Sequence, residues 1–181
     1  MSVLAPEGFT AAGISAGIKS DGILDVAVVA AEQAVPAAAV FTTNMAAAAP
    51  VRLSRRNLAA GPTARAVVLN SGCANAATGK RGRAVAELTA NRTAELLSCA
   101  PEDVLVCSTG TIGTHLPPET ITAGVVDALA SLGGDAEHAN AAARAIMTTD
   151  SEPKEVIVET GGFAVGGMAK GAGMIRPDMA T

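Results

Sequence analysis

The apolar side chains of this chain are almost all small, and this limits how its layers can pack. Hydrophobic residues make up 49% of the 181 positions, yet aromatic residues make up 2%, with neither Trp nor Tyr. Runs such as Ala46–Ala49 and Ala141–Ala143 supply much of the apolar content. Small side chains fill a core only when the elements that carry them lie close together. We therefore expect closely spaced layers of secondary structure.

Length and charge restrict the class of protein further. Charged residues make up only 17% of the chain, and a chain this apolar is not disordered. The length suits one compact domain or two small ones, and no repeat, linker or charge block marks a boundary, so we expect a single domain over residues 1–181. The 17 acidic and 13 basic residues give a net charge of −4. Nucleic acid is not expected as a partner, because the chain has no overall positive field.

Signals of a secreted, membrane or metal-binding protein are not found. Met1–Phe9 has neither a basic leader nor a long apolar segment. The most apolar early stretch, Ile23–Ala31, is interrupted by Asp25 and falls short of the ~18 residues that a membrane span needs. The three cysteines form no Cys-x-x-Cys pair, and with two histidines no metal-ligand spacing emerges. We expect a cytoplasmic protein with reduced thiols, no membrane contact and no metal.

The hydrophobic pattern predicts strands and helices that alternate irregularly. Short β-branched runs predict strands at Asp25–Val29, Ala38–Thr42, Ala66–Leu69, Val104–Cys107 and Glu155–Val158. Apolar residues three or four apart predict helices at Arg83–Ser98 and Pro117–Leu132, and Asp135 is expected to cap a third that runs to Ile146. These elements indicate an α/β (α+β) fold in which mixed sheets form layers with flanking helices.

Two small, polar loops each follow a predicted strand. The first is Leu69–Gly79; the second is Cys107–Gly113, where backbone N–H groups and hydroxyls suit an oxyanion hole. The first is equally well explained as an ordinary turn into a helix, because Gly, Asn and Ser are common turn residues. For the second, taken as an isolated string, a structural turn between strand and helix is the preferred interpretation. The second is not a phosphate-binding loop of the Walker type, since no Gly-Lys-Ser/Thr follows it. Taken singly, neither loop decides a function.

Two more stretches lie nearer the C-terminal end. Ala145–Asp150 ends in two hydroxyls and a carboxylate, which could contact a polar substrate, although a cap at the helix end is the preferred interpretation of the stretch taken alone. Gly166–Thr181 is apolar and glycine-rich with a lone Lys170, which is unusual for the end of a domain, so a further segment is expected after it. A threonine at such a junction can attack the preceding carbonyl, and its freed α-amine can then act as the base of an N-terminal nucleophile.

Together, five segments in this order resemble the ornithine acetyltransferase family, the glutamate N-acetyltransferases of bacterial arginine biosynthesis. The segments are Ala38–Asn44, Asn70–Ala76, Cys107–Gly113, Ala145–Asp150 and Lys170–Thr181. The resemblance spans almost the whole chain. It implies the α chain of a self-cleaving precursor, with an N-terminal-nucleophile-like architecture that is incomplete without a downstream β chain. It also implies an α2β2 assembly in the cytoplasm.

The resemblance further implies a multifunctional acyltransferase that needs no cofactor. The precursor would cleave itself between Ala180 and Thr181, after which Thr181 is the nucleophile at the head of the β chain. Acetyl would pass from N-acetylornithine to this threonine and then to glutamate, with ping-pong kinetics. Whether acetyl-CoA is also a donor is left open. Since this chain includes Thr181 as its last residue, its state of cleavage is left open as well.

The resemblance also implies roles for individual residues, each at a position of this chain that matches a motif of the family. Thr109 and Gly110 are expected to form the oxyanion hole, the first through its hydroxyl and the second through its backbone N–H. Thr148 and Lys170, joined by Thr181, are expected to contact the substrate, with Lys170 offering a positive charge to a carboxylate. Two alternatives stay open: a self-processed aminopeptidase or amidase in which water accepts the acyl group, and a non-catalytic domain that binds a small metabolite.

Overall fold

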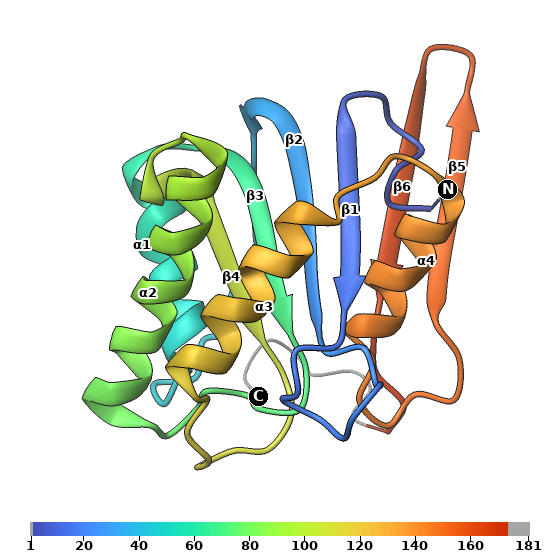
Figure 1. Cartoon of the computed structure of the whole chain (residues 1–181). Helices are drawn as coiled ribbons and strands as arrows, with labels where there is room; N and C mark the ends of the chain where they lie inside the picture. Colours follow the sequence, from blue (N-terminus) through green and yellow to red (C-terminus); the bar gives the residue numbers. More distant parts are fainter. Residues whose placement is uncertain (1, 174–181) are drawn as a thin grey trace.

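The computed structural model of the chain describes residues 2–173, which form two sheets and four α-helices (Figure 1). In chain order the elements are β1 (Phe9–Ile14), β2 (Val26–Pro36), α1 (Ala49–Ala60), β3 (Thr63–Asn70), α2 (Gly79–Leu97), a short 3₁₀ turn (Pro101–Asp103), β4 (Val104–Ser108), α3 (Pro118–Ala130), α4 (Ala136–Ala145), β5 (Lys154–Thr160) and β6 (Phe163–Ala169). The expected α/β class with sheets and flanking helices is confirmed.

The larger sheet has the order β1-β2-β3-β4, and its last pair is parallel. β1 pairs antiparallel with β2, and β2 pairs antiparallel with β3. β3 and β4 run in the same direction, joined through α2, and their register sets Asn70 opposite Ser108. The carboxyl ends of two parallel strands therefore meet at one edge, which is where ligands bind in sheets of this kind.

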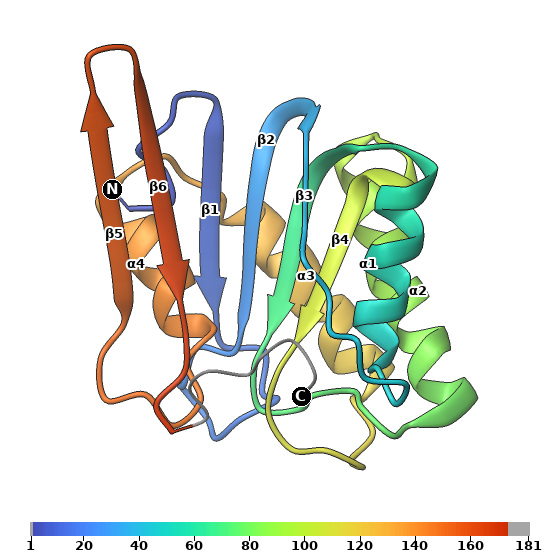
Figure 2. The same ribbon diagram turned by 180° about the vertical axis from the view of Figure 1, so that it is seen from behind.

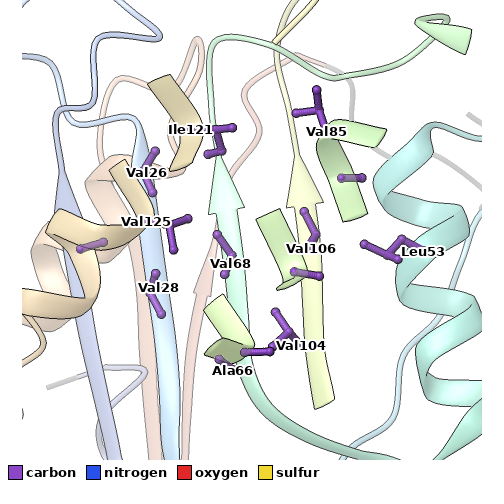
Figure 3. Packing of buried hydrophobic residues seen from close by; sticks show 14 of the residues in the cluster. Val26, Val28, Leu53, Ala66, Val68, Val85, Val104, Val106, Ile121 and Val125 are labelled. Carbon is purple, nitrogen blue, oxygen red and sulfur yellow. The ribbon is translucent and has the colours of Figure 1, made fainter. Parts of the chain in front are cut away.

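Small side chains form the core on both faces of this sheet. One face packs against α1, α2 and α3; Figure 3 shows Val26, Val28, Val68, Val104 and Val106 of the strands with Leu53, Val85, Ile121 and Val125 of the helices. The other face packs its alanines against Ala139, Ala142 and Ala145 of α4. At Gly13 a Cβ would lie 2.1 Å from the carbonyl oxygen of Ala141. The layers are as closely spaced as the composition predicted.

Most predicted elements are present, with shifted ends. The helices predicted at Arg83–Ser98 and Pro117–Leu132 correspond to α2 and α3, and Asp135 caps α4 by accepting from the N–H groups of Glu137 and His138. The strand predicted at Ala38–Thr42 is wrong: those residues form no strand. β2 ends just before them at Pro36, which has no N–H to offer a ladder.

Loops gather at one end of the molecule. Figure 1 and Figure 2 show the segments that follow β1, β3, β4 and β6, and the segment that precedes β5, at the same end. The hairpin β5–β6 lies with α4 beyond β1, on the side away from α1 and α2 (Figure 2). Within residues 2–173, each helix is too short or too polar to cross a lipid bilayer. All three cysteines are free thiols.

Candidate functional site

A cavity of about 270 Å³ opens where the parallel strands β3 and β4 end. Its lining combines apolar side chains with hydroxyls, an amide and an ammonium group: Leu69, Asn70, Cys107, Ser108, Thr109, Ile146 and Lys170. These residues come from β3, β4, the C-terminal end of α4 and the segment after β6. Four parts of the chain that are far apart in sequence thus share one small cavity.

The two loops that follow β3 and β4 are bonded to one another beside this cavity. The N–H of Thr109 donates to the carbonyl of Asn70 (2.9 Å), and the N–H of Thr111 donates to that of Gly72 (3.2 Å). The N–H of Ala74 returns a bond to the carbonyl of Thr111 (3.0 Å). The sequence suggested two separate turns, whereas the parallel pairing of the strands makes them one backbone unit.

Gly110 lies where these loops come closest. Its φ of +131° is in the region that disfavours any residue with a side chain. A Cβ added there would lie 2.3 Å from the carbonyl carbon of Gly72 and 2.6 Å from the nitrogen of Cys73. Glycine at position 110 is therefore required by the close approach of the two loops.

A buried carboxylate fixes the loop between β1 and β2 against the same unit. Asp25 is fully buried and accepts backbone hydrogen bonds from Ala16 (2.7 Å), Ile18 (2.6 Å) and Lys19 (2.9 Å). Its carbonyl accepts from the N–H of Ser71 (2.9 Å). Sequence reasoning noted Asp25 only as an interruption of an apolar run; a carboxylate at the start of a buried strand is itself a signal of such a network.

Lys19 joins that loop to the end of α4. Its Nζ donates to the carbonyls of Leu24 (3.0 Å) and Met147 (2.7 Å). Burial lowers the pKa of Lys19, and the nearby carboxylates of Asp25 and Asp150 act in the opposite direction. Nothing in the sequence pattern pointed to Lys19, because its partners are backbone carbonyls, one of them 128 residues away.

Asp150 connects the segment after α4 to the segment after β6. Its side chain is 0% exposed and accepts from Lys154 Nζ (2.6 Å), from the N–H of Thr148 (3.1 Å) and from the N–H of Gly171 (2.5 Å). These donors, Lys154 foremost, hold the pKa of Asp150 far below its usual range. The carboxylate is therefore ionised at neutral pH.

The structure brings together some of the residues that the sequence predicted. Thr109 and Lys170 line the same cavity, and Gly110 follows Thr109 in the exposed loop. Thr148 is exposed and does not belong to the lining of this cavity, but its N–H is bound by Asp150 beside Gly171. The predicted cleavage residues Ala180 and Thr181 lie outside the described residues. Among residues 2–173, no three metal-ligating side chains cluster.

The fold and cavity define a class of protein: layered α/β domains with a small cavity at the carboxyl ends of a parallel strand pair. Within this class, the chain belongs to the ArgJ family, whose family model matches residues 10–181. It is 48% identical over 184 residues to the arginine biosynthesis bifunctional protein ArgJ of Bifidobacterium longum, and 49% identical over 182 residues to that of Thermobifida fusca. Each comparison covers all of this chain and 47% of the relative, so the chain spans about half their length.

Two solved structures share the fold. One is the crystal structure of ornithine acetyltransferase from Mycobacterium tuberculosis in complex with ornithine: 46% identity, a TM-score of 0.91, 96% of this chain and 93% of that chain covered. The other is the ArgJ protein of Bacillus halodurans, with 37% identity, a TM-score of 0.89, 97% of this chain and 92% of that chain covered. The predicted resemblance to this family, as its N-terminal α portion, is confirmed.

Proposed function

We propose that this chain is the α half of a glutamate N-acetyltransferase that moves acetyl from N-acetylornithine to glutamate in arginine biosynthesis. The observation that carries the proposal is the cavity at the ends of β3 and β4, lined by both Thr109 and Lys170. Its support comes from the 46% identity to an ornithine acetyltransferase crystallised with ornithine. A hydroxyl and an ammonium group beside one small cavity suit an acyl group and a carboxylate of an acylated amino acid.

The proposed reaction has two acyl transfers through Thr181. The Thr181 oxygen attacks the acetyl carbonyl of N-acetylornithine, and its proton passes to its own α-amine. The carbon–nitrogen bond breaks, and the leaving nitrogen of ornithine takes that proton. In the second transfer the amine of glutamate attacks the acetyl ester and gives up a proton, the ester bond breaks, and the Thr181 oxygen is protonated again.

In this proposal, Thr109 and Gly110 form the oxyanion hole. Each tetrahedral intermediate places negative charge on the former carbonyl oxygen, and donors that already point at it lower the barrier. The loop that carries both residues is held by hydrogen bonds to the loop after β3, so its donors are preorganised. Lys170 supplies a positive charge to a carboxylate of the substrate.

The proposal also includes a second half of the protein, the β chain of the same precursor. The curated relatives are about twice as long as this chain, whereas the matched chains of the two crystal structures are covered to 93% and 92%. This relation supports a precursor divided near Ala180–Thr181 into an α and a β chain. The hairpin β5–β6 exposes Val156, Ile157, Val158, Phe163 and Val165. Five exposed apolar side chains on one hairpin suit contact with a partner chain, and an αβ unit that pairs into α2β2 belongs to the same proposal.

A labelling experiment on the full-length precursor tests the proposed function. N-acetylornithine with an isotopically labelled acetyl group is supplied with and without glutamate. We expect labelled N-acetylglutamate with glutamate, and without it a peptide that begins at Thr181 and carries one acetyl group. Label released as acetate in the presence of glutamate would instead identify an amidase. Binding without turnover would identify a non-catalytic metabolite-binding domain.

Removal of the Thr109 hydroxyl tests the oxyanion hole. Thr109→Val keeps the shape of the side chain and removes the donor, so we expect kcat to fall by about 10²–10³-fold with little change in KM. Steady-state kinetics of acetyl transfer measure this. Thr109→Ser, which keeps the hydroxyl, serves as the control and should retain most of the rate. Equal kcat values for the Val and Ser variants would show that this hydroxyl does not stabilise the oxyanion.

A further inference from the structure

One carboxylate, whose side chain is 0% exposed in a residue of intermediate burial, lies between the two substrate-contacting residues of the proposed site. Asp150 follows Thr148 by two residues in the segment between α4 and β5, and it bonds to the N–H of Gly171, 21 residues further on. That N–H belongs to the peptide bond that joins Lys170 to Gly171. The carboxylate therefore holds the main chain at Thr148 and at Lys170 together.

We propose that Asp150 is a positioning residue that sets where Thr148 and Lys170 lie relative to the bound substrate. The inference rests on the proposed function, since it takes those two residues as substrate contacts. Hydrogen bonds to a carboxylate are stronger than those between neutral groups, so an ionised acceptor defines the position of both backbone donors. Asp150 itself is not among the residues that line the cavity, and in this proposal it does not touch the substrate.

The surroundings of Asp150 explain how its negative charge is balanced. Its side chain is 0% exposed, whereas Lys154, its cationic partner, is 49% exposed and balances the charge from the solvent side. Two of its three donors are backbone N–H groups of segments that otherwise have no strand pairing with one another. The carboxylate extends the link between these segments beyond the last β5–β6 pair, which joins Lys154 to Ala169.

The segment that carries Thr148 is held on its other side as well. Lys19 Nζ donates to the carbonyl of Met147 (2.7 Å), and the hydroxyl of Ser71 donates to that of Ala145 (2.5 Å). The N-terminal side of the segment is thus fixed to the loops beside the cavity. On its C-terminal side, the last β5–β6 pair joins Lys154 to Ala169, and Asp150 adds a bond to the peptide that follows Lys170. Gly171 is at φ +133°, a conformation that disfavours side chains, so the turn after Lys170 favours glycine at this position.

Asp150→Asn in the full-length precursor tests the proposal. Asparagine keeps the size but offers one acceptor oxygen and no charge, so it cannot hold both N–H groups as the carboxylate does. We expect KM for N-acetylornithine and for glutamate to rise by about tenfold, with a smaller change in kcat, because the contacts that recognise substrate are displaced. Asp135→Asn is the matched control: Asp135 also accepts two backbone N–H groups, but as the cap of α4, and its kinetics should equal the wild type.

A double-mutant cycle separates positioning from general destabilisation. If Asp150 acts through Lys170, then Asp150→Asn in a Lys170→Met background raises KM by less than about threefold, so the two effects do not multiply. Full multiplication of the effects shows that Asp150 does not act through Lys170, which rejects the proposal as stated. A wild-type KM in Asp150→Asn alone overturns the positioning of both residues. A wild-type KM in Lys170→Met alone contradicts the proposed substrate contact instead, which keeps the two failures distinguishable.

A second variant covers the case in which Asp150→Asn fails to fold or to cleave itself. Asp150→Glu keeps the charge and the pair with Lys154 but moves the acceptor by one methylene. We expect it to fold, to be cleaved, and to show a raised KM of the same kind. A folded, cleaved Asp150→Glu variant with wild-type KM would count against the proposal, because the acceptor position would then not matter.

Discussion

Thr181→Ala in the full-length precursor is expected to leave a single uncut chain without measurable acetyl transfer. The proposal assigns the Thr181 hydroxyl two tasks, attack on the carbonyl of Ala180 during cleavage and attack on the acetyl group during turnover. Alanine has no nucleophile for either task. Loss of a catalytic nucleophile lowers kcat by about 10⁴-fold or more. A denaturing gel measures cleavage, and production of N-acetylglutamate measures turnover.

Thr181→Ser is the control for this variant. Serine keeps a hydroxyl at the same position, so it should still yield two fragments and retain transfer activity at a reduced rate. Two fragments from the Thr181→Ala precursor would show that Thr181 is not the cleavage nucleophile. An uncut Thr181→Ala precursor with normal acetyl transfer would separate cleavage from catalysis and contradict the acetyl-threonine intermediate.

The helices and strands that the sequence predicted are those with a clear pattern of residues within the segment itself. β-branched runs marked β3 and β4, and periodic apolar residues marked α2 and α3. β1 and β6 were missed because their sequences, FTAAGI and FAVGGMA, are rich in glycine and alanine, which have low strand propensity. α1 was missed because it begins Ala-Pro with no side-chain cap and no acidic residue in its first turn.

The sequence predicted those residues of the site that belong to short motifs, but not the contacts that hold them in place. The motifs indicated Thr109 and Lys170, and the structure places both on one cavity. The bonding of the loops after β3 and β4 depends on a parallel pairing that no local pattern defines. Lys19 and Asp150 act through backbone partners 128 and 21 residues away, so their contacts exist only once the chain is folded.

This long-range bonding explains why a small change at one glycine should have a large effect. The loop that carries Gly110 cannot shift freely, because the N–H of Thr109 is bound to Asn70 and the N–H of Thr111 is bound to Gly72. A methyl group at position 110 would overlap the backbone of Gly72 and Cys73 at 2.3 and 2.6 Å, at a φ of +131°. Relief of that overlap requires the two loops to separate, which displaces the proposed oxyanion donors.

Gly110→Ala is therefore expected to reduce both stability and activity. Backbone strain together with overlap costs about 2–4 kcal/mol of unfolding free energy, or roughly 5–10 °C in Tm. Displaced oxyanion donors lower kcat by about 10²-fold or more. Gly134→Ala is the matched control, since a Cβ there meets nothing within 4 Å. It should change stability by less than about 1 kcal/mol. Thermal unfolding and acetyl-transfer kinetics of both variants test this prediction. Equal Tm and kcat values for Gly110→Ala and Gly134→Ala would show that the two loops can separate without cost. The approach of Gly110 to Gly72 would then not hold the oxyanion loop in place.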